Sequence, residues 1–261
     1  MKRGRPSLRQ DVRTIGALMR RGLNEILRVP GGAIPGVLAP TIFMLGLSAA
    51  FGEAARLPGF DADDFRTFIV PVGMLQGAGF TGAATGVNLA RDIERGWFDR
   101  LLLAPAGRPV LLAGVVGSAC LRCLLPASFL LIVAFALGVS WPGVGALVLA
   151  GLLIMSLAAA AACYATVLAL RFRTQQAAPL MQVGAFASIL FTTAYVPREL
   201  LSDWLRAIAD VNPVTHVLEG VRQGFVGDVS WASTWPALLA VAGLVTVFGT
   251  LAVRGMRRQG V

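Results

Sequence analysis

Three cysteines and one histidine are the side chains whose types suggest metal or redox chemistry. Cys120 and Cys123 have the Cys-x-x-Cys spacing of redox and metal pairs, whereas Cys163 and His216 stand apart in the sequence. A structural metal site usually draws four ligands, often from a second Cys or His cluster, and this sequence has no such cluster. All three cysteines fall inside long apolar runs. Small buried thiols are therefore the favoured interpretation, and no metal site is predicted.

Hydrolytic chemistry is also poorly supported. A serine-histidine hydrolase would have to use His216, and the chain lacks the Gly-x-Ser-x-Gly sequence that presents a nucleophilic serine. The phosphate-binding loop Gly-x-x-x-x-Gly-Lys-Ser/Thr needs a lysine after six other residues, and the only lysine is Lys2. The chain is therefore predicted to have no catalytic residue and no cofactor of its own. If ATP drives its activity, ATP and Mg bind a different polypeptide.

The composition indicates a membrane protein. Hydrophobic residues make up 56% of the chain, charged residues 14%, and the mean hydropathy is +0.71. A transmembrane helix needs roughly 20 mostly apolar residues. Six runs meet this, and the turn sequence 140–143 separates the third from the fourth: 29–52, 67–90, 109–138, 144–170, 174–197 and 229–253. The expected fold is an all-α integral membrane protein with six transmembrane helices in one domain, 1–261.

The arginines predict the orientation, because cytoplasmic loops carry an excess of Lys and Arg. Segments 1–28, 91–108, 171–173 and 254–258 hold seventeen Lys and Arg, whereas 53–66 and 198–228 hold five Arg against nine Asp and Glu. Both termini, including the tail 254–261, are therefore predicted to be cytoplasmic. Basic loops facing anionic membrane lipid explain the net charge of +9, so no nucleic-acid partner is expected.

The amino-terminal segment 1–28 is predicted to contain a helix that lies in the membrane interface. Between Pro6 and Pro30 the apolar residues approximate helical spacing, and arginines occupy another face. Ser7 and Gln10 fit a capping box at the start of this helix. The alternative is an ordinary solvated basic tail.

A charged stretch lies between the second and third apolar runs, where a passive connection would need only a few turn residues. We expect a short amphipathic cytoplasmic helix at 91–100 on which a soluble partner can act. Its residues are Arg91, Asp92, Glu94, Arg95, Gly96, Trp97, Phe98, Asp99 and Arg100.

Segment 197–228, between the fifth and sixth runs, is predicted to form two short amphipathic helices on the outer face. Asn212 and Pro213 separate them as N-cap and first helical residue. Apolar stripes follow on both sides: Leu200, Leu201, Trp204, Leu205 and Ile208, then Val214, Val217, Leu218, Val221 and Phe225. The pair either covers the exit of a transport pathway or forms a cap with no moving part.

Four polar residues inside the runs are candidates for a pathway: Gln76, Asn88, Arg122 and Gln182. Arg122 is a costly charge in the membrane and should face a cavity or partner, unless its side chain extends to the cytoplasm. Hydrogen bonds between helices are the alternative for the other three. Gly73-x-x-x-Gly77 and Gly82-x-x-x-Gly86 predict close helix packing. A proton-coupled antiporter would ordinarily need an acid within a span, and all fourteen Asp and Glu lie outside the predicted spans or in interfacial segments.

The chain resembles the membrane subunits of type 2 ATP-binding-cassette (ABC) transporters. Members often read Arg-Glu-x-Gly-Thr-x-Glu-Arg-Leu-Leu-x-x-Pro after the second span, and Glu94–Pro105 is similar, with Trp97 in place of a small polar residue. A second likeness runs through the outer segment, in which an aromatic-Pro step precedes a tryptophan, an Asn-Pro element, an acid and an arginine. The residues that follow this order, together with the neighbouring histidine, form the expected outer gate: Tyr195, Pro197, Trp204, Asn212, Pro213, His216, Glu219 and Arg222.

This resemblance covers essentially the whole chain. It implies a non-catalytic permease in the bacterial plasma membrane that pairs with a second permease subunit, identical or paralogous, and with ABC ATPase subunits. The 91–100 helix would be the coupling helix, and an exported drug, lipid or glycan the cargo. The absence of acids within the spans favours an amphipathic or hydrophobic cargo over an ion. A secondary, ion-coupled transporter of small amphipathic molecules is the alternative.

Overall fold

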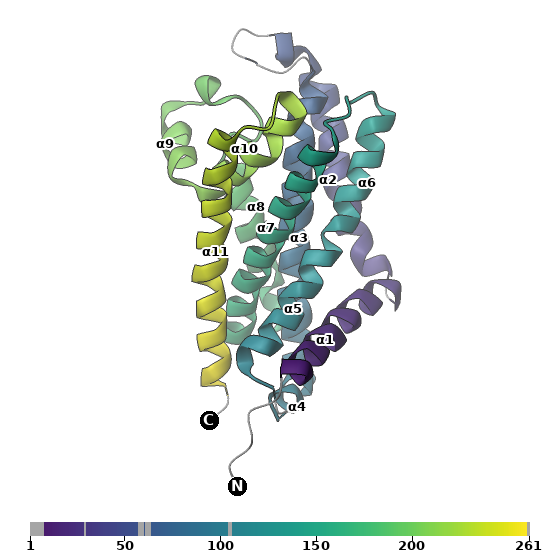
Figure 1. The fold of residues 1–261 in the computed structure, drawn as a ribbon, viewed down its shortest axis with the longest axis vertical. Helices are drawn as coiled ribbons and strands as arrows, with labels where there is room; N and C mark the ends of the chain where they lie inside the picture. The colour runs from purple at the N-terminus through teal and green to yellow at the C-terminus, as the bar shows by residue number, and fades with distance from the viewer. Residues whose placement is uncertain (1–7, 29, 57–59, 61–63, 104–105, 260–261) are drawn as a thin grey trace.

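The computed structural model describes residues 8–28, 30–56, 60, 64–103 and 106–259, and regular structure in these ranges is entirely helical. Long helices run along one axis (Figure 1), and α1, α4 and the end of α11 lie at the end of the bundle opposite to α9 and α10. We call these the terminal end and the distal end. The α-helices are α1 (Leu8–Arg28), α2 (Pro30–Phe51), α3 (Phe65–Glu94), α4 (Trp97–Leu103), α5 (Arg108–Arg122), α6 (Leu124–Ala136), α7 (Val144–Phe172), α8 (Ala178–Leu190), α9 (Asp203–Val211), α10 (Pro213–Val226) and α11 (Trp231–Arg258). Three short 3-10 helices, η1 (Gly52–Arg56), η2 (Gln175–Ala177) and η3 (Arg198–Leu200), complete them.

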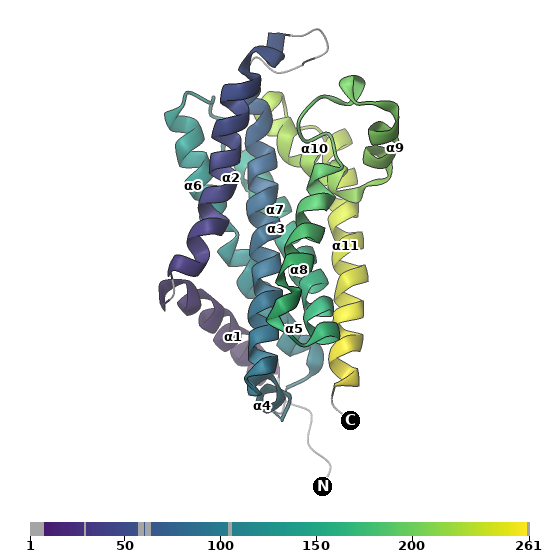
Figure 2. The same ribbon diagram turned by 180° about the vertical axis from the view of Figure 1, so that it is seen from behind.

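Helix α3 is the centre of the bundle, packed against α2, α5, α6, α7, α8 and α10, and both views show it between its neighbours (Figure 2). Every residue from 68 to 79 is buried, as expected for a helix that is apolar all round. Its two glycine motifs make close contacts, as the sequence predicts. A Cβ atom at Gly82 or Gly86 would overlap Ala161 or Ala165 of α7, and one at Gly73 would overlap Leu130 of α6.

The six expected apolar runs coincide with helices α2, α3, α5–α6, α7, α8 and α11. Among the described residues, three helical segments are both long and apolar enough to cross a membrane: Arg108–Ala136, Val144–Phe172 and Trp231–Arg258. The first is not one continuous helix, because α5 ends at Arg122 and α6 begins at Leu124. Pro126 has no N–H to donate to the carbonyl of Arg122 four residues earlier, which explains the interruption.

The fifth run ends earlier than expected. Helix α8 stops at Leu190, and residues 191–197 follow without regular helix although the apolar run continues to 197. The side chain of Asn212 donates to the carbonyls of Ser188 (2.7 Å) and Phe191 (2.8 Å). These bonds replace the N–H donors that a continuing helix would supply, and inside apolar surroundings an early end needs such replacements.

Helix α1 confirms the expected amino-terminal helix, although Ser7 and its capping box lie outside the described residues. It packs along α5, where a Cβ at Gly114 would lie 2.7 Å from the Leu18 side chain. At the other end of the chain, α11 extends as a helix through Arg258, so the basic residues expected in a tail lie on this helix, with Arg257 and Arg258 in its last turn.

Candidate functional site

The predicted charged helix 91–100 is divided in two by a turn, which corrects its expected bounds. Arg91, Asp92 and Glu94 belong to the last turn of α3, and α4 begins only at Trp97. Between them Gly96 has φ +69°, a left-handed conformation that glycine adopts without strain. The chain therefore turns within two residues and places α4 at the terminal end of the bundle (Figure 1).

Glu94 connects the end of α3 to the turn between α7 and α8. Its carboxylate accepts hydrogen bonds from the Thr174 hydroxyl (2.8 Å), the Gln175 backbone N–H (2.9 Å) and the Gln175 side chain. These bonds, above all the one from the Gln175 side chain, lower the pKa of Glu94. Arg91 donates to the Gln175 side-chain oxygen at 3.0 Å. Two side chains of the predicted helix are thus used to hold the protein's own turn.

A residue that sequence reasoning missed, Arg21 of α1, completes the terminal end. Its Nη2 lies 2.7 and 2.9 Å from the two oxygens of Asp92. Its guanidinium carbon lies 3.5 Å from the centroid of the Trp97 ring. One side chain therefore joins α1, α3 and α4. Arg21 and Asp92 are 71 positions apart in the sequence, which explains why no local pattern revealed the pair.

Helix α4 presents one face to the outside and buries the other. Phe98 is 1% exposed and anchors the helix in the bundle, whereas Leu103 is 75% exposed. Asp99 and Arg100 are exposed beside it. Arg108 closes the helix by donating to the carbonyl of Leu102 at 2.9 Å. The outward face therefore combines charge with an exposed apolar side chain, the mixture found at protein interfaces.

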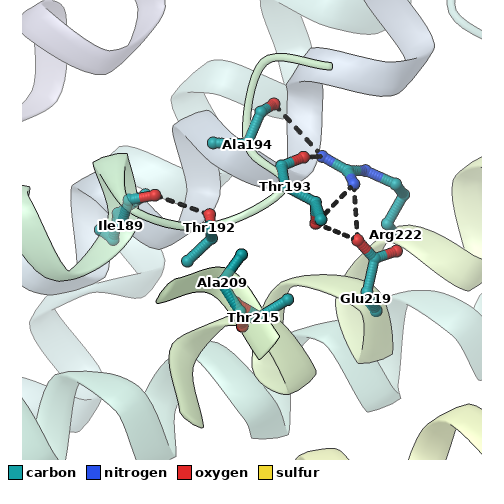
Figure 3. Close-up of polar contacts among 8 residues, drawn as sticks. All are labelled: Ile189, Thr192, Thr193, Ala194, Ala209, Thr215, Glu219 and Arg222. Carbon is teal, nitrogen blue, oxygen red and sulfur yellow. Dashed lines mark hydrogen bonds and ion pairs between the residues drawn. The ribbon is translucent and has the colours of Figure 1, made fainter. Parts of the chain in front are cut away.

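At the distal end a buried arginine organises the chain beyond α8 (Figure 3). Arg222 of α10 is 5% exposed and donates to the carbonyls of Thr193 (2.9 Å) and Ala194 (3.3 Å). It also pairs with Glu219 at 2.8 Å, and the Thr193 hydroxyl donates to the same carboxylate oxygen. Its guanidinium carbon lies 3.8 Å from the centroid of the Phe68 ring of α3. The cation thus has a carboxylate, two carbonyl oxygens and an aromatic face as partners, while its Nε atom is buried without a hydrogen-bond acceptor among the described residues.

A comparison with known protein families identifies the family to which this chain belongs. Residues 13–226 match the family described as ABC-2 type transporter. The chain belongs to this family. It is 24% identical over 242 residues to the daunorubicin resistance ABC transporter permease protein DrrB1 of Streptomyces coeruleorubidus, covering 92% of this chain and 84% of that protein. It is 26% identical over 193 residues to the probable multidrug ABC transporter permease YbhR of Escherichia coli K12, covering 69% and 50%.

Another relative is the putative transport permease ycf38 of Pyropia yezoensis, 24% identical over 229 residues, covering 85% of this chain and 77% of that protein. The family defines this chain as a non-catalytic, multi-pass transmembrane permease subunit of an ABC transporter. The hydrolysis of ATP in such a transporter belongs to an ATPase subunit, in agreement with the missing phosphate-binding loop.

The predicted outer residues of this ABC-2 permease lie on α9, α10 and the segments that join α8, α9 and α10, at the distal end. Tyr195 accepts a hydrogen bond from the buried Gln76 side chain at 3.3 Å, and Pro197 is buried. Asn212 caps α10 by accepting from the Val214 N–H at 3.0 Å. The apolar stripe of α10 is buried in the bundle, and Pro213 is the first residue of this helix, as the sequence predicts. The stripe around α9 is largely exposed: Trp204 is 61% and Ile208 43% exposed.

The four candidate pathway residues do not share one passage. Gln76 contacts Tyr195 at the distal end. Arg122 and Asn88 line a small cavity of about 50 Å³ near α1, where Arg122 donates to the Thr85 hydroxyl. Gln182 is exposed on α8. Arg122 therefore contacts α3 of its own chain and borders a small cavity beside α1.

Proposed function

We propose that this permease is the membrane subunit of an ATP-driven exporter and that the outward face of α4 binds the ATPase. The observation that carries the proposal is that face itself. Asp99, Arg100 and Leu103 are exposed at the terminal end, on a helix fixed by the buried Phe98 and by Arg21 over Trp97. A helix held this firmly transmits a push from a soluble partner into α3 and α1 instead of absorbing it.

The membrane arrangement belongs to the same proposal. Helices α2, α3, α5–α6, α7, α8 and α11 are six spans of one domain, and α1 lies in the cytoplasmic interface. The terminal end is cytoplasmic because it carries the basic segments, so the distal end faces outward from a bacterial plasma membrane. The exposed sides of α2 and α8, which include Phe43 and Val183, contact lipid and a second permease subunit.

The cargo we propose is an amphipathic or hydrophobic molecule, a drug, lipid or lipid-linked glycan. The apolar helices carry their Asp and Glu only near their ends, which disfavours an ion-coupled pathway. The names of two relatives refer to daunorubicin resistance and multidrug transport, which supports the drug class. We place the outward gate at the distal residues around Tyr195 and Arg222, where α8 ends and the chain depends on side-chain hydrogen bonds.

The experiment is purification of the tagged chain from its native cells in a mild detergent. Co-purifying proteins are identified by mass spectrometry, and the sample is assayed for ATPase activity. We expect an ABC ATPase in near-stoichiometric amount. The double exchange Asp99→Arg and Arg100→Asp keeps the net charge of α4 and should remove the ATPase, as should Leu103→Asp. The matched control is Arg254→Asp, an exposed arginine on α11 at the same end.

If the Arg254→Asp control lost the ATPase to the same extent as the α4 variants, the assignment of the contact to α4 would be contradicted. Recovery of the wild-type chain without any ATPase, in several lipid and detergent conditions, would reject the exporter and favour the ion-coupled secondary transporter.

A further inference from the structure

The distal end contains a cavity that the coupling proposal does not use. It has a volume of about 680 Å³ and opens between α10, the chain after α8 and the start of α11. This volume lies in the range of sites for drug-sized ligands. Its walls include the buried Phe68 and Thr193, so one side of the cavity is the same network that holds Arg222.

The charge of the lining is negative. Four carboxylates and two guanidinium groups border the cavity, a net charge of −2 with His216 neutral. Both guanidinium groups already have carboxylate partners, Arg198 with Asp210 at 2.7 Å and Arg222 with Glu219 at 2.8 Å. The lining therefore favours a cation over an anion, and its charge is not cancelled by the arginines.

The carboxylate of Glu219 is held in a fixed orientation at the wall of this cavity. Its Oε1 atom accepts from both Thr193 and Arg222, which fixes the carboxylate, and the side chain is 42% exposed. No described residue donates a hydrogen bond to Oε2. A carboxylate oriented by buried donors, with its second oxygen open to a cavity, meets a positively charged group without reorganising.

The chemistry indicates an organic cation instead of a metal ion. Among the residues that the structure describes, no group of three or more His, Cys, Asp or Glu is placed to hold a metal. The cavity is also far larger than an ion needs, and the ring of Phe68 and the side chains of Pro197 and Val226 supply apolar surface.

We propose that this cavity binds an organic cation, with an apolar body against Phe68 and Pro197 and its positive charge beside Oε2 of Glu219. The site is at the opposite end of the bundle from α4, so it does not rest on the proposed ATPase contact. Binding a cation at Glu219 also engages the partner of Arg222 and thus the segment that Arg222 holds.

The test uses two probes of nearly equal size and opposite charge, tetraphenylphosphonium and tetraphenylborate. Binding to the purified full chain in dodecylmaltoside micelles is measured by equilibrium dialysis, with empty micelles as the blank. We expect the cation to bind saturably at one site per chain. The anion should show no saturable binding. Glu219→Gln should weaken cation binding by at least about fivefold, the effect expected when one close opposite charge is removed.

A second variant guards against misfolding of Glu219→Gln. Asp228 is an exposed residue in the lining of the cavity. Asp228→Lys should lower the affinity for the cation by several fold through charge repulsion, while the Arg222 network stays intact. Glu53→Gln, an exposed carboxylate of η1 outside the cavity, is the control and should bind as the wild type does. Equal saturable binding of both probes, or unchanged cation affinity in both cavity variants, would overturn the proposal.

Two sources of such a cation are separated by adding phosphatidylethanolamine to the micelles. Competition with tetraphenylphosphonium would assign the site to an amine lipid headgroup, and absence of competition would assign it to a soluble cation. Either result, together with sensitivity to Glu219→Gln, supports an organic cation site.

Discussion

Arg21 and Trp97 stack on one another at the terminal end, with 3.5 Å between the guanidinium carbon and the ring centroid. The same guanidinium holds both oxygens of Asp92. Three helices that are distant in sequence therefore meet at one side chain. Trp97 thereby links α4 to α1 through Arg21.

The first prediction concerns this link. Arg21→Ala should loosen α1 from the bundle, because a partly exposed cation–π contact contributes about 0.5–1 kcal/mol and the ion pair, with Arg21 46% exposed, about as much or less. The summed cost of about 0.5–2 kcal/mol should make the backbone amides of α1 exchange hydrogen roughly two- to thirtyfold faster. Trp97→Thr removes only the stacking contact and should give a roughly two- to fivefold change. In a double variant the two effects should not add fully, because both substitutions remove the same stacking contact; full additivity would show that the stacking contributes nothing.

Glu94 predicts a pH dependence at the same end. Its lowered pKa means that the folded protein favours the carboxylate, so the link to Thr174 and Gln175 is fully present above the ordinary pKa of 4.5. The link is lost as the pH falls through the lowered pKa. Hydrogen exchange at the Gln175 amide, corrected for intrinsic rate, should show protection down to below pH 4.5. Glu94→Gln should reduce this protection at every pH above the lowered pKa, and Glu199→Gln at the distal end should not; protection independent of both pH and Glu94 would disprove the link.

Local sequence patterns predicted the positions of the helices well. They predicted less well where some helices end and which polar residues hold those ends. The apolar runs located α2, α3, α7 and α11, and Asn212-Pro213 located the start of α10, because each signal is contained within a few turns of chain. The glycine motifs of α3 predicted tight packing for the same reason. Such signals depend on propensity and burial, which neighbouring residues determine.

The end of α8, the division of the charged stretch and the position of Arg21 required contacts between distant residues. Apolar composition continues to residue 197, yet Asn212 makes an earlier helix end possible by hydrogen bonding to Ser188 and Phe191. Arg21 is one of many arginines in the first 28 residues, and only the fold brings it to Trp97. Polar partners of this kind leave no periodic signal.

Close packing of α3 on α7 gives a third prediction. Gly86→Val should destabilise the protein by about 1–3 kcal/mol, because the new side chain overlaps Ala165 and the core cannot expand freely. Gly151→Val on α7 is the matched control, since nothing lies within 4 Å of a Cβ there. The two substitutions carry the same helix-propensity change. Thermal unfolding in detergent should show a clearly lower midpoint for Gly86→Val, and equal midpoints would mean that this interface is loosely packed.

The fourth prediction concerns Arg222 and separates burial from hydrogen bonding. Arg222→Met leaves the carbonyls of Thr193 and Ala194 without a donor and Glu219 without its cation. A buried carbonyl left without a donor costs about 1–3 kcal/mol, and the 42% exposed Glu219 carboxylate adds less because solvent screens it, so the unfolding midpoint and folded yield should fall. Arg222→Lys should lie between, because an ammonium keeps the charge and lacks the planar group that spans two carbonyls and covers Phe68.

Arg206 supplies the control, because it also donates hydrogen bonds to backbone carbonyls but is partly exposed to solvent. It donates to the carbonyls of Arg198, Glu199 and Leu201, but its side chain is 38% exposed, so solvent can replace those bonds after Arg206→Met. That variant should lose no more than about 1 kcal/mol. If the two Met variants unfolded at the same temperature, burial of Arg222 would not be what stabilises the end of α8. A larger loss for Arg222 would mean that the non-helical segment after Leu190 depends on this one cation.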